Sequence, residues 1–137
     1  MKNVVFIFII FSLTVYYGCS KGSGKSVASI GGVQDSTIIV FTKNVHDFGE
    51  LKSGESVGCN FNFTNEGKKP LLIQNVTAGC GCTNVKYPLK PVAPGKSGFI
   101  EVTYNTRGKQ GHQRQVITVF SNGSEHPETL IIRANVH

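Results

Sequence analysis

The sequence contains no tryptophan and only one methionine, at position 1, among its 137 residues. A methionine-rich copper site is therefore excluded. Acidic side chains are also few, 8 against 14 basic ones, for a formal charge of +6. The basic residues are scattered, whereas nucleic-acid binding calls for a clustered basic stripe with aromatic neighbours. We therefore expect a solvated basic surface and no nucleic-acid partner.

Arrangements typical of catalysis are missing as well. No Ser, His and Asp set can be assigned to a catalytic order, and the Lys and Glu side chains form no convergent pair. Gly24-Lys25-Ser26 is similar to the end of a phosphate-binding loop, but that motif requires a glycine where the chain has Cys19. We therefore expect that the protein is not an enzyme.

The N-terminal segment has the features of an export signal. Lys2 is followed by a largely apolar run from Val4 to Tyr17. As a helix this run would be about 21 Å long, shorter than the roughly 30 Å hydrocarbon core of a bilayer. Its length and flanks predict a signal peptide over residues 1–18 rather than a membrane-spanning helix.

The residues after this run predict a lipid anchor. Gly18-Cys19 directly follows the apolar run and resembles the cleavage box of bacterial lipoproteins, in which the cysteine thiol is acylated and the chain is cut before it. We expect lipidation at Cys19, with an ordinary secretory signal as the alternative. Two acyl chains hold a protein stably on a membrane. Residues 19–35, rich in Gly and Ser, predict a flexible tether.

Residues 36–137 have the pattern of one all-β domain. Val57, Cys59, Phe61 and Phe63 alternate with small or polar residues, which is the clearest period-two pattern in the chain and places Cys59 on the inward face. Turn residues separate similar runs, and no segment has the period of an amphipathic helix. About seven short strands predict an immunoglobulin-like β-sandwich. We expect them at residues 36–42, 57–64, 70–77, 83–87, 98–105, 115–120 and 129–136.

Three further local features are predicted. Phe48 should fill part of the core, and Gly49 should form a kink or bulge. Pro94-Gly95 suits a tight turn, and Asn122-Gly123 indicates a hairpin.

Five motifs follow one another along residues 36–136: His46-Asp47-Phe48-Gly49, Phe61-Asn62-Phe63-Thr64-Asn65-Glu66-Gly67-Lys68-Lys69-Pro70-Leu71, Ala78-Gly79-Cys80-Gly81-Cys82-Thr83, Pro91-Val92-Ala93-Pro94-Gly95 and Val102-Thr103-Tyr104-Asn105. Taken together and in order, they resemble the bacterial domain-of-unknown-function family fifteen-seventy-three. The resemblance implies an immunoglobulin-like sandwich akin to Hydin-type domains and frequent attachment as a lipoprotein, but no established activity. Position 59, often histidine in that family, is cysteine here.

Reactive side chains are concentrated in Cys80-Gly81-Cys82. With Cys19 assigned to the anchor, Cys59 is the third cysteine of the domain, so one thiol must remain unpaired within the chain. A bridge between Cys80 and Cys82 closes a very small loop, contributes only about 1.6 kcal/mol and would be readily reduced. A bridge from Cys59 to either of them closes a loop of about 22–24 residues and contributes about 3.4 kcal/mol. If Cys59 lies beneath the Cys-Gly-Cys loop, this longer bridge is favoured.

Two other uses of these cysteines remain open. Two thiolates one residue apart suit Cu(I) or Zn(II), with Cys59 or a histidine as a further ligand. His112 is a weak candidate for that ligand, as are His46 and His126, and none of them has diagnostic spacing. Thiol–disulfide exchange is the third interpretation, although the chain has no Cys-x-x-Cys at a helix start.

The sequence as a whole predicts a lipid-anchored module in the bacterial cell envelope, periplasmic or on the outer membrane, that binds a protein partner and needs no cofactor. Recognition would use the sheet surface or exposed edge strands. The alternatives are a periplasmic copper- or zinc-binding protein and, third, a thiol–disulfide redox protein.

Overall fold

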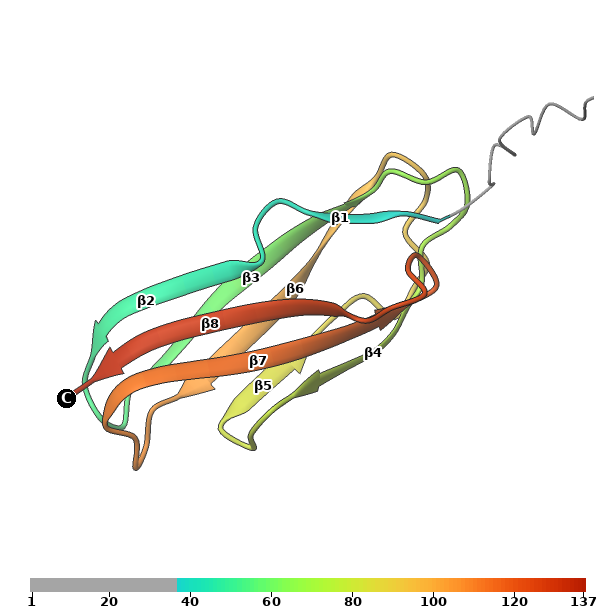
Figure 1. Cartoon of the computed structure of the whole chain (residues 1–137). Helices are drawn as coiled ribbons and strands as arrows, with labels where there is room; N and C mark the ends of the chain where they lie inside the picture. Colours follow the sequence, from blue (N-terminus) through green and yellow to red (C-terminus); the bar gives the residue numbers. More distant parts are fainter. Residues whose placement is uncertain (1–36) are drawn as a thin grey trace, which may run out of the picture. The chain divides into compact units, whose positions relative to one another are not determined.

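The computed structural model describes residues 37–137, so the predicted signal peptide, the lipidation site Cys19 and the tether lie outside the described residues. Eight strands form two four-stranded sheets packed face to face, which confirms the predicted all-β sandwich (Figure 1). One sheet has the order β1-β3-β6-β5 and the other β2-β8-β7-β4. The strands are β1 (Ile39–Phe41), β2 (Val45–Leu51), β3 (Ser56–Asn65), β4 (Ile73–Ala78), β5 (Thr83–Lys86), β6 (Ser97–Asn105), β7 (Gly111–Ser121) and β8 (Glu128–Val136).

Alternate side chains of the strands fill the space between the sheets. Phe61 and Phe63 of β3 are completely buried, as are Ile100 and Val102 of the neighbouring β6. On the facing sheet, the buried side chains of β8 are Leu130, Ile132, Ala134 and Val136. The period-two pattern of the sequence therefore predicts correctly which side chains form the core.

The strand that the sequence pattern does not reveal is β2. It pairs in parallel with β8, and the register shifts between Asp47 and Glu50. Gly49 lies in this bulge with a φ of +69°, and its N–H donates to Asp47 Oδ1 at 2.8 Å. The predicted bulge at Gly49 is confirmed, and half-buried Phe48 packs against the core as expected. The bulge breaks the alternation by which a strand is recognised.

A buried asparagine joins the end of β3 to two loops. Asn65 is fully buried, and its Nδ2 donates to the carbonyl oxygens of Lys69 at 2.8 Å and Val92 at 2.9 Å. Its Oδ1 accepts the Gly67 N–H at 3.0 Å. These bonds satisfy the amide in the core and fix the loops on either side of it.

The tight turn at Pro94-Gly95 is confirmed. Gly95 has a φ of +71°, and the Lys96 N–H donates to the Ala93 carbonyl at 3.0 Å. A left-handed residue at this position of a turn favours glycine.

The Asn122-Gly123 hairpin needs correction in its detail. β7 and β8 do form an antiparallel hairpin, but residues 122–127 connect them and Gly123 has no positive φ. The Asn122 side chain instead ties the loop to the start of β4, accepting the Leu72 N–H at 2.8 Å and donating to the Pro70 carbonyl at 3.1 Å.

Residues 37–137 contain no helix long and apolar enough to cross a membrane.

Candidate functional site

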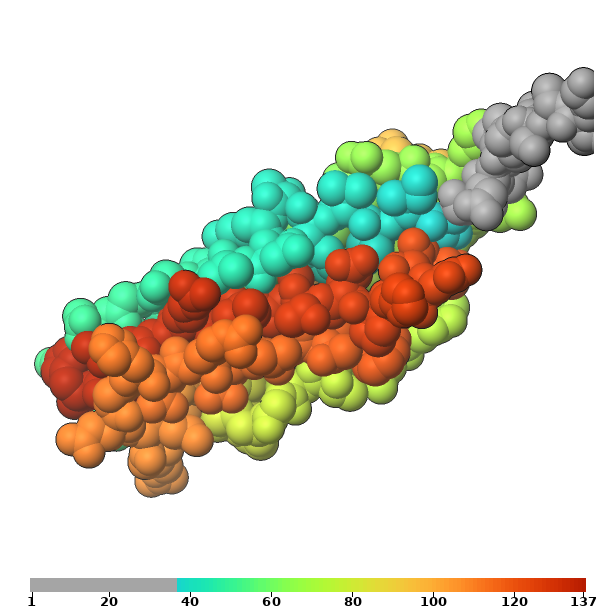
Figure 2. All heavy atoms as spheres, viewed as in Figure 1, coloured from blue at the N-terminus to red at the C-terminus, as the bar shows by residue number. Residues whose placement is uncertain are grey.

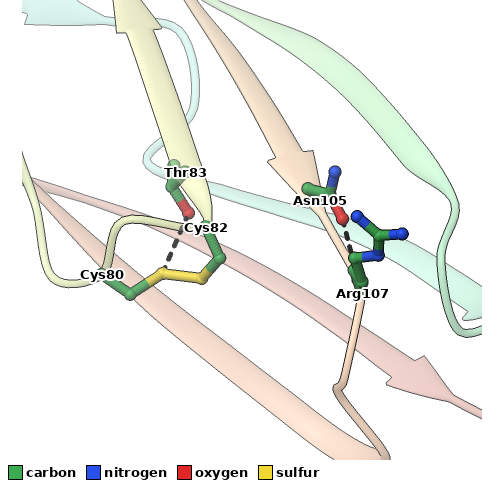
Figure 3. Close-up of a disulfide and its surroundings, with 5 residues drawn as sticks. All are labelled: Cys80, Cys82, Thr83, Asn105 and Arg107. Atoms are coloured by element: carbon green, nitrogen blue, oxygen red, sulfur yellow. Dashed lines mark hydrogen bonds between the residues drawn. A yellow bond between two sulfur atoms is a disulfide. The ribbon is translucent and has the colours of Figure 1, made fainter.

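The Cys-Gly-Cys segment lies where the chain passes from one sheet to the other. It joins β4, an edge strand of one sheet, to β5, an edge strand of the other (Figure 1). Cys80 and Cys82 form a disulfide with their Cα atoms 5.2 Å apart (Figure 3). The bridge therefore closes a loop with only Gly81 between its ends.

Backbone hydrogen bonds attach this loop to both sheets. The Gly79 N–H donates to the Val116 carbonyl of β7 at 3.1 Å, and the Asn105 N–H of β6 donates to the Cys82 carbonyl at 2.9 Å. Both cysteines are half-buried, and the Cys82 side chain packs against the core. The Thr83 Oγ1 lies 3.5 Å from the Cys80 Sγ (Figure 3).

Cys59 does not take part in this bridge, which corrects the expected pairing. Cys59 lies opposite Val102 on one side of β6, whereas β5, with Cys82 just before it, pairs with the other side. Two strand spacings separate β3 from β5, roughly 9.6 Å. A disulfide requires Cα atoms closer than about 7 Å. The strand order of the sheet therefore prevents the longer bridge.

Cys59 is instead a free thiol on the inward face, as its position in the alternation predicts. Burial raises the pKa of Cys59 to about 11, and the charge of Lys43 opposes this shift to a smaller extent. The thiol is therefore protonated at neutral pH.

The candidate histidine ligands lie away from the cysteine pair. His112 points outward on β7, four residues before Val116, so it is roughly 13 Å along the strand from the residue that bonds to the loop. His46 packs edge-on against Phe48 in β2, and His126 lies in the β7–β8 connection. Within residues 37–137 no three His, Cys, Asp or Glu side chains are grouped so that they could hold a metal ion.

His112 lines a hollow of ≈ 360 Å³ on the outer surface of the β2-β8-β7-β4 sheet. The outer surface of this sheet faces the reader in Figure 2. The hollow is bordered by charged side chains of both signs, including Asp47, Arg114 and Arg133. The Glu50 carboxylate at its rim accepts two hydrogen bonds from Asn135 Nδ2, at 3.0 and 3.1 Å.

A second hollow, which sequence reasoning missed, lies on the outer surface of the other sheet where the chain leaves β5. It measures ≈ 400 Å³, and Phe99 in its lining is 49% exposed. The alternation of β6 places Ile100 inward and Phe99 outward, so the exposed phenylalanine that marks this hollow could have been predicted from the sequence. The lining is mainly apolar apart from an ion pair between Lys86 and Glu101 at 3.4 Å. The lining residues are Lys86, Tyr87, Pro88, Ser97, Gly98, Phe99 and Glu101.

The backbone of β5 has one unpaired edge beside this hollow. In an antiparallel pair, successive residues direct their N–H and C=O groups alternately toward and away from the partner strand. Because Cys82 is bonded to β6, the backbone groups of Asn84 and Lys86 also point toward β6, and those of Val85 point away. No other strand of the described residues pairs with β5.

Comparison with known proteins gives a family without an assigned activity. The model of the family described as "Protein of unknown function (DUF1573)" matches residues 39–136. No curated protein matches the chain.

Solved structures share the fold at low sequence identity. A protein of unknown function from Porphyromonas gingivalis is 18% identical with a TM-score of 0.64, and the match covers 73% of this chain and 47% of that one. The secreted serine protease VesC from Vibrio cholerae is 16% identical with a TM-score of 0.57, covering 72% and 23%. A PapD-like domain of human CEP192 is 10% identical with a TM-score of 0.61, covering 75% and 87%. The chain thus spans about half of the first protein and about a quarter of the second.

Proposed function

Since the chain belongs to the DUF1573 family, whose function is unknown, we propose that it acts as a non-catalytic binding module of the bacterial cell envelope. Its edge strand β5 accepts an extended segment of a partner protein. The added segment continues the β1-β3-β6-β5 sheet, so that backbone hydrogen bonds supply affinity and side-chain pockets supply specificity.

The observation that carries this proposal is the combination of a free backbone edge with an apolar hollow at its end. The outward N–H and C=O of Val85 are the groups that a partner strand would use. The hollow lined by Tyr87 and Phe99 would receive an apolar side chain of that strand. Exposed Leu89 adds apolar surface just beyond it, and exposed apolar surface next to polar residues is a feature of interaction sites.

The module is held at a membrane through lipidated Cys19. Support for this comes from the apolar run, the small residue before the cysteine and the Gly/Ser-rich stretch that follows. Cys19→Ala should move the protein from the membrane fraction to the soluble fraction, while Cys59→Ala should leave it on the membrane. Membrane association that survives the Cys19 change would contradict the anchor.

Peptide selection tests the binding site and does not require the partner to be identified first. A random decapeptide library is selected on the purified protein, and the affinities of selected peptides are measured by fluorescence anisotropy. We expect peptides with an apolar residue at every second position. Phe99→Ala should weaken their binding at least tenfold, since a buried aromatic anchor contributes about 2 kcal/mol or more to an interface.

Phe120→Ala is the matched control, because Phe120 is another exposed phenylalanine but lies on the outer surface of the opposite sheet. It should leave the affinity unchanged. A selection that yields no peptide, or peptides that bind the Phe99→Ala variant as tightly as the native protein, would contradict the proposal.

A further inference from the structure

We propose that the Cys80–Cys82 disulfide is a site of reversible exchange with an external dithiol, which reduces the bridge in one stoichiometric two-electron step. The site is separate from the hollow beside β5, and the inference does not depend on peptide binding there.

The size of the loop makes this bridge easy to open. The two cysteines are two positions apart in the sequence, so the bridge restricts the unfolded chain much less than the longer bridge from Cys59 would. A disulfide that adds little to stability loses little when it is reduced. Reduction of this bridge therefore leaves the domain folded, as a bridge that opens and closes requires.

The free thiol of the domain is kept apart from the exchange. Cys59 lies two strands away from the bridge, on the far side of β6. Burial also raises the pKa of Cys59 to about 11, so that little thiolate is available to attack a disulfide. Residues 37–137 contain no other free thiol, so the nucleophile comes from another molecule.

The surroundings of the two sulfur atoms distinguish their roles. Cys82 packs against the core, whereas Cys80 lies in the loop outside the core cluster. An external thiolate therefore attacks Cys80 Sγ, forming a mixed disulfide and releasing Cys82 as a thiolate that takes a proton from water.

The second thiolate of the partner completes the exchange. It attacks the partner's own sulfur in the mixed disulfide, which closes the partner's disulfide and releases Cys80 as a thiolate. The Thr83 hydroxyl, 3.5 Å from Cys80 Sγ, donates a hydrogen bond to this leaving thiolate (Figure 3). Two electrons pass from the partner dithiol to the bridge, the Cys80 thiolate takes a proton from water as Cys82 did, and both cysteines end as thiols.

The exchange can run backward because the loop is held in place by its backbone. The bonds from Gly79 to Val116 and from Asn105 to Cys82 involve main-chain atoms only. They keep the two thiols adjacent after reduction, so an oxidant joins the same pair again.

Reduction of the Cys59→Ser protein tests the lability of the bridge, because that variant has no competing thiol in the domain. The full-length protein is incubated at neutral pH with dithiothreitol or glutathione, acid-quenched, alkylated and weighed by mass spectrometry. We expect more than half of the bridges to open in about 10 mM glutathione and to close again when glutathione disulfide is added. If fewer than about one tenth of the molecules have an open bridge under these conditions, the proposal is overturned.

Variants that keep one of the two bridge cysteines test which sulfur is attacked. In the Cys59→Ser background, Cys82→Ser leaves Cys80 and Cys80→Ser leaves Cys82. Glutathione disulfide should modify Cys80 at least tenfold faster than Cys82, as measured by the mass gained on the peptide that contains the cysteine. Equal rates, or faster modification of Cys82, would overturn the assignment of Cys80.

Discussion

The reactivity of Cys59 depends on its position in β3. The alternation of β3 directs its side chain inward, where burial raises its pKa to about 11. A thiol with a raised pKa is less often ionised at a given pH, although each thiolate is more nucleophilic. The two effects act on the reaction rate in opposite directions, and the smaller fraction of thiolate has the larger effect.

Alkylation of Cys59 should therefore be slow in the folded protein. At pH 8 we expect iodoacetamide to react at least roughly tenfold more slowly than with the same cysteine in urea, since a pKa two units higher outweighs the gain in nucleophilicity. The rate in the folded protein should continue to increase up to pH 11 instead of levelling off near 9. Mass spectrometry of the oxidised protein gives both rates, and Cys59→Ser supplies the blank. Equal rates in both states would contradict the burial of the thiol.

Gly98 is a second residue whose environment leads to a prediction. A Cβ on Gly98 would lie 2.7 Å from the tip of the Phe63 ring, which is completely buried. Gly98→Ala should lower the free energy of unfolding by about 1–3 kcal/mol, because an overpacked core must shift its side chains. Urea denaturation measures the change.

Gly58→Ala is the control for this change. Gly58 lies on β3, and a Cβ there meets only ordinary contacts, the nearest being the Val102 carbonyl at 3.5 Å. This variant should be neutral or slightly stabilised, since alanine loses less conformational entropy than glycine on folding. A Gly98→Ala protein as stable as the Gly58→Ala protein would show that Phe63 is not packed as described.

Among the elements, the end of β3 depends on one side chain. Asn65 bonds to the backbone of Lys69, Val92 and Gly67. Asn65→Ala would remove these three hydrogen bonds, although the Val92 carbonyl still accepts the Leu71 N–H. Each lost hydrogen bond of this kind costs about 0.5–1.5 kcal/mol. We expect a destabilisation of about 2–4 kcal/mol in urea denaturation.

Asn62→Ala serves for comparison, because Asn62 lies on the exposed face of the same strand. Asn62→Ala should change the free energy of unfolding by no more than about 0.5 kcal/mol. If the two asparagines proved equivalent, the loops around residue 65 would have to be held by other contacts.

The elements also show what could be predicted from the sequence. Alternating residues in β3, β6 and β8 identify both the strands and their inward faces, because one side of each strand packs against the other sheet. β2 is not predicted from the sequence, because the bulge at Gly49 interrupts its alternation. Its pairing with β8 also joins residues more than eighty positions apart.

At the scale of the whole molecule, strand order decides what the site contains. Alternation places Cys59 on the correct face of its strand, but it does not reveal that β6 lies between Cys59 and the Cys-Gly-Cys loop. The same order brings Lys86 and Tyr87 beside Phe99 and so creates the hollow next to β5. Both results depend on which strands are neighbours, and a single sequence contains no local signal for that.

The domain of residues 37–137 is therefore a sandwich with an open edge at β5, and the proposal that this edge receives a partner strand can be tested at one amide. In the free protein the amides of Asn84 and Lys86 point toward β6, whereas the Val85 amide points away from it, to the side on which no described strand pairs with β5. These two neighbours provide internal controls.

The most direct measurement is hydrogen exchange by NMR, with and without a peptide selected from the library. We expect the peptide to slow exchange of the Val85 amide at least tenfold while the amides of Asn84 and Lys86, already protected, change little. A peptide that binds tightly and leaves the Val85 amide exchanging as before would contradict the addition of a strand at β5.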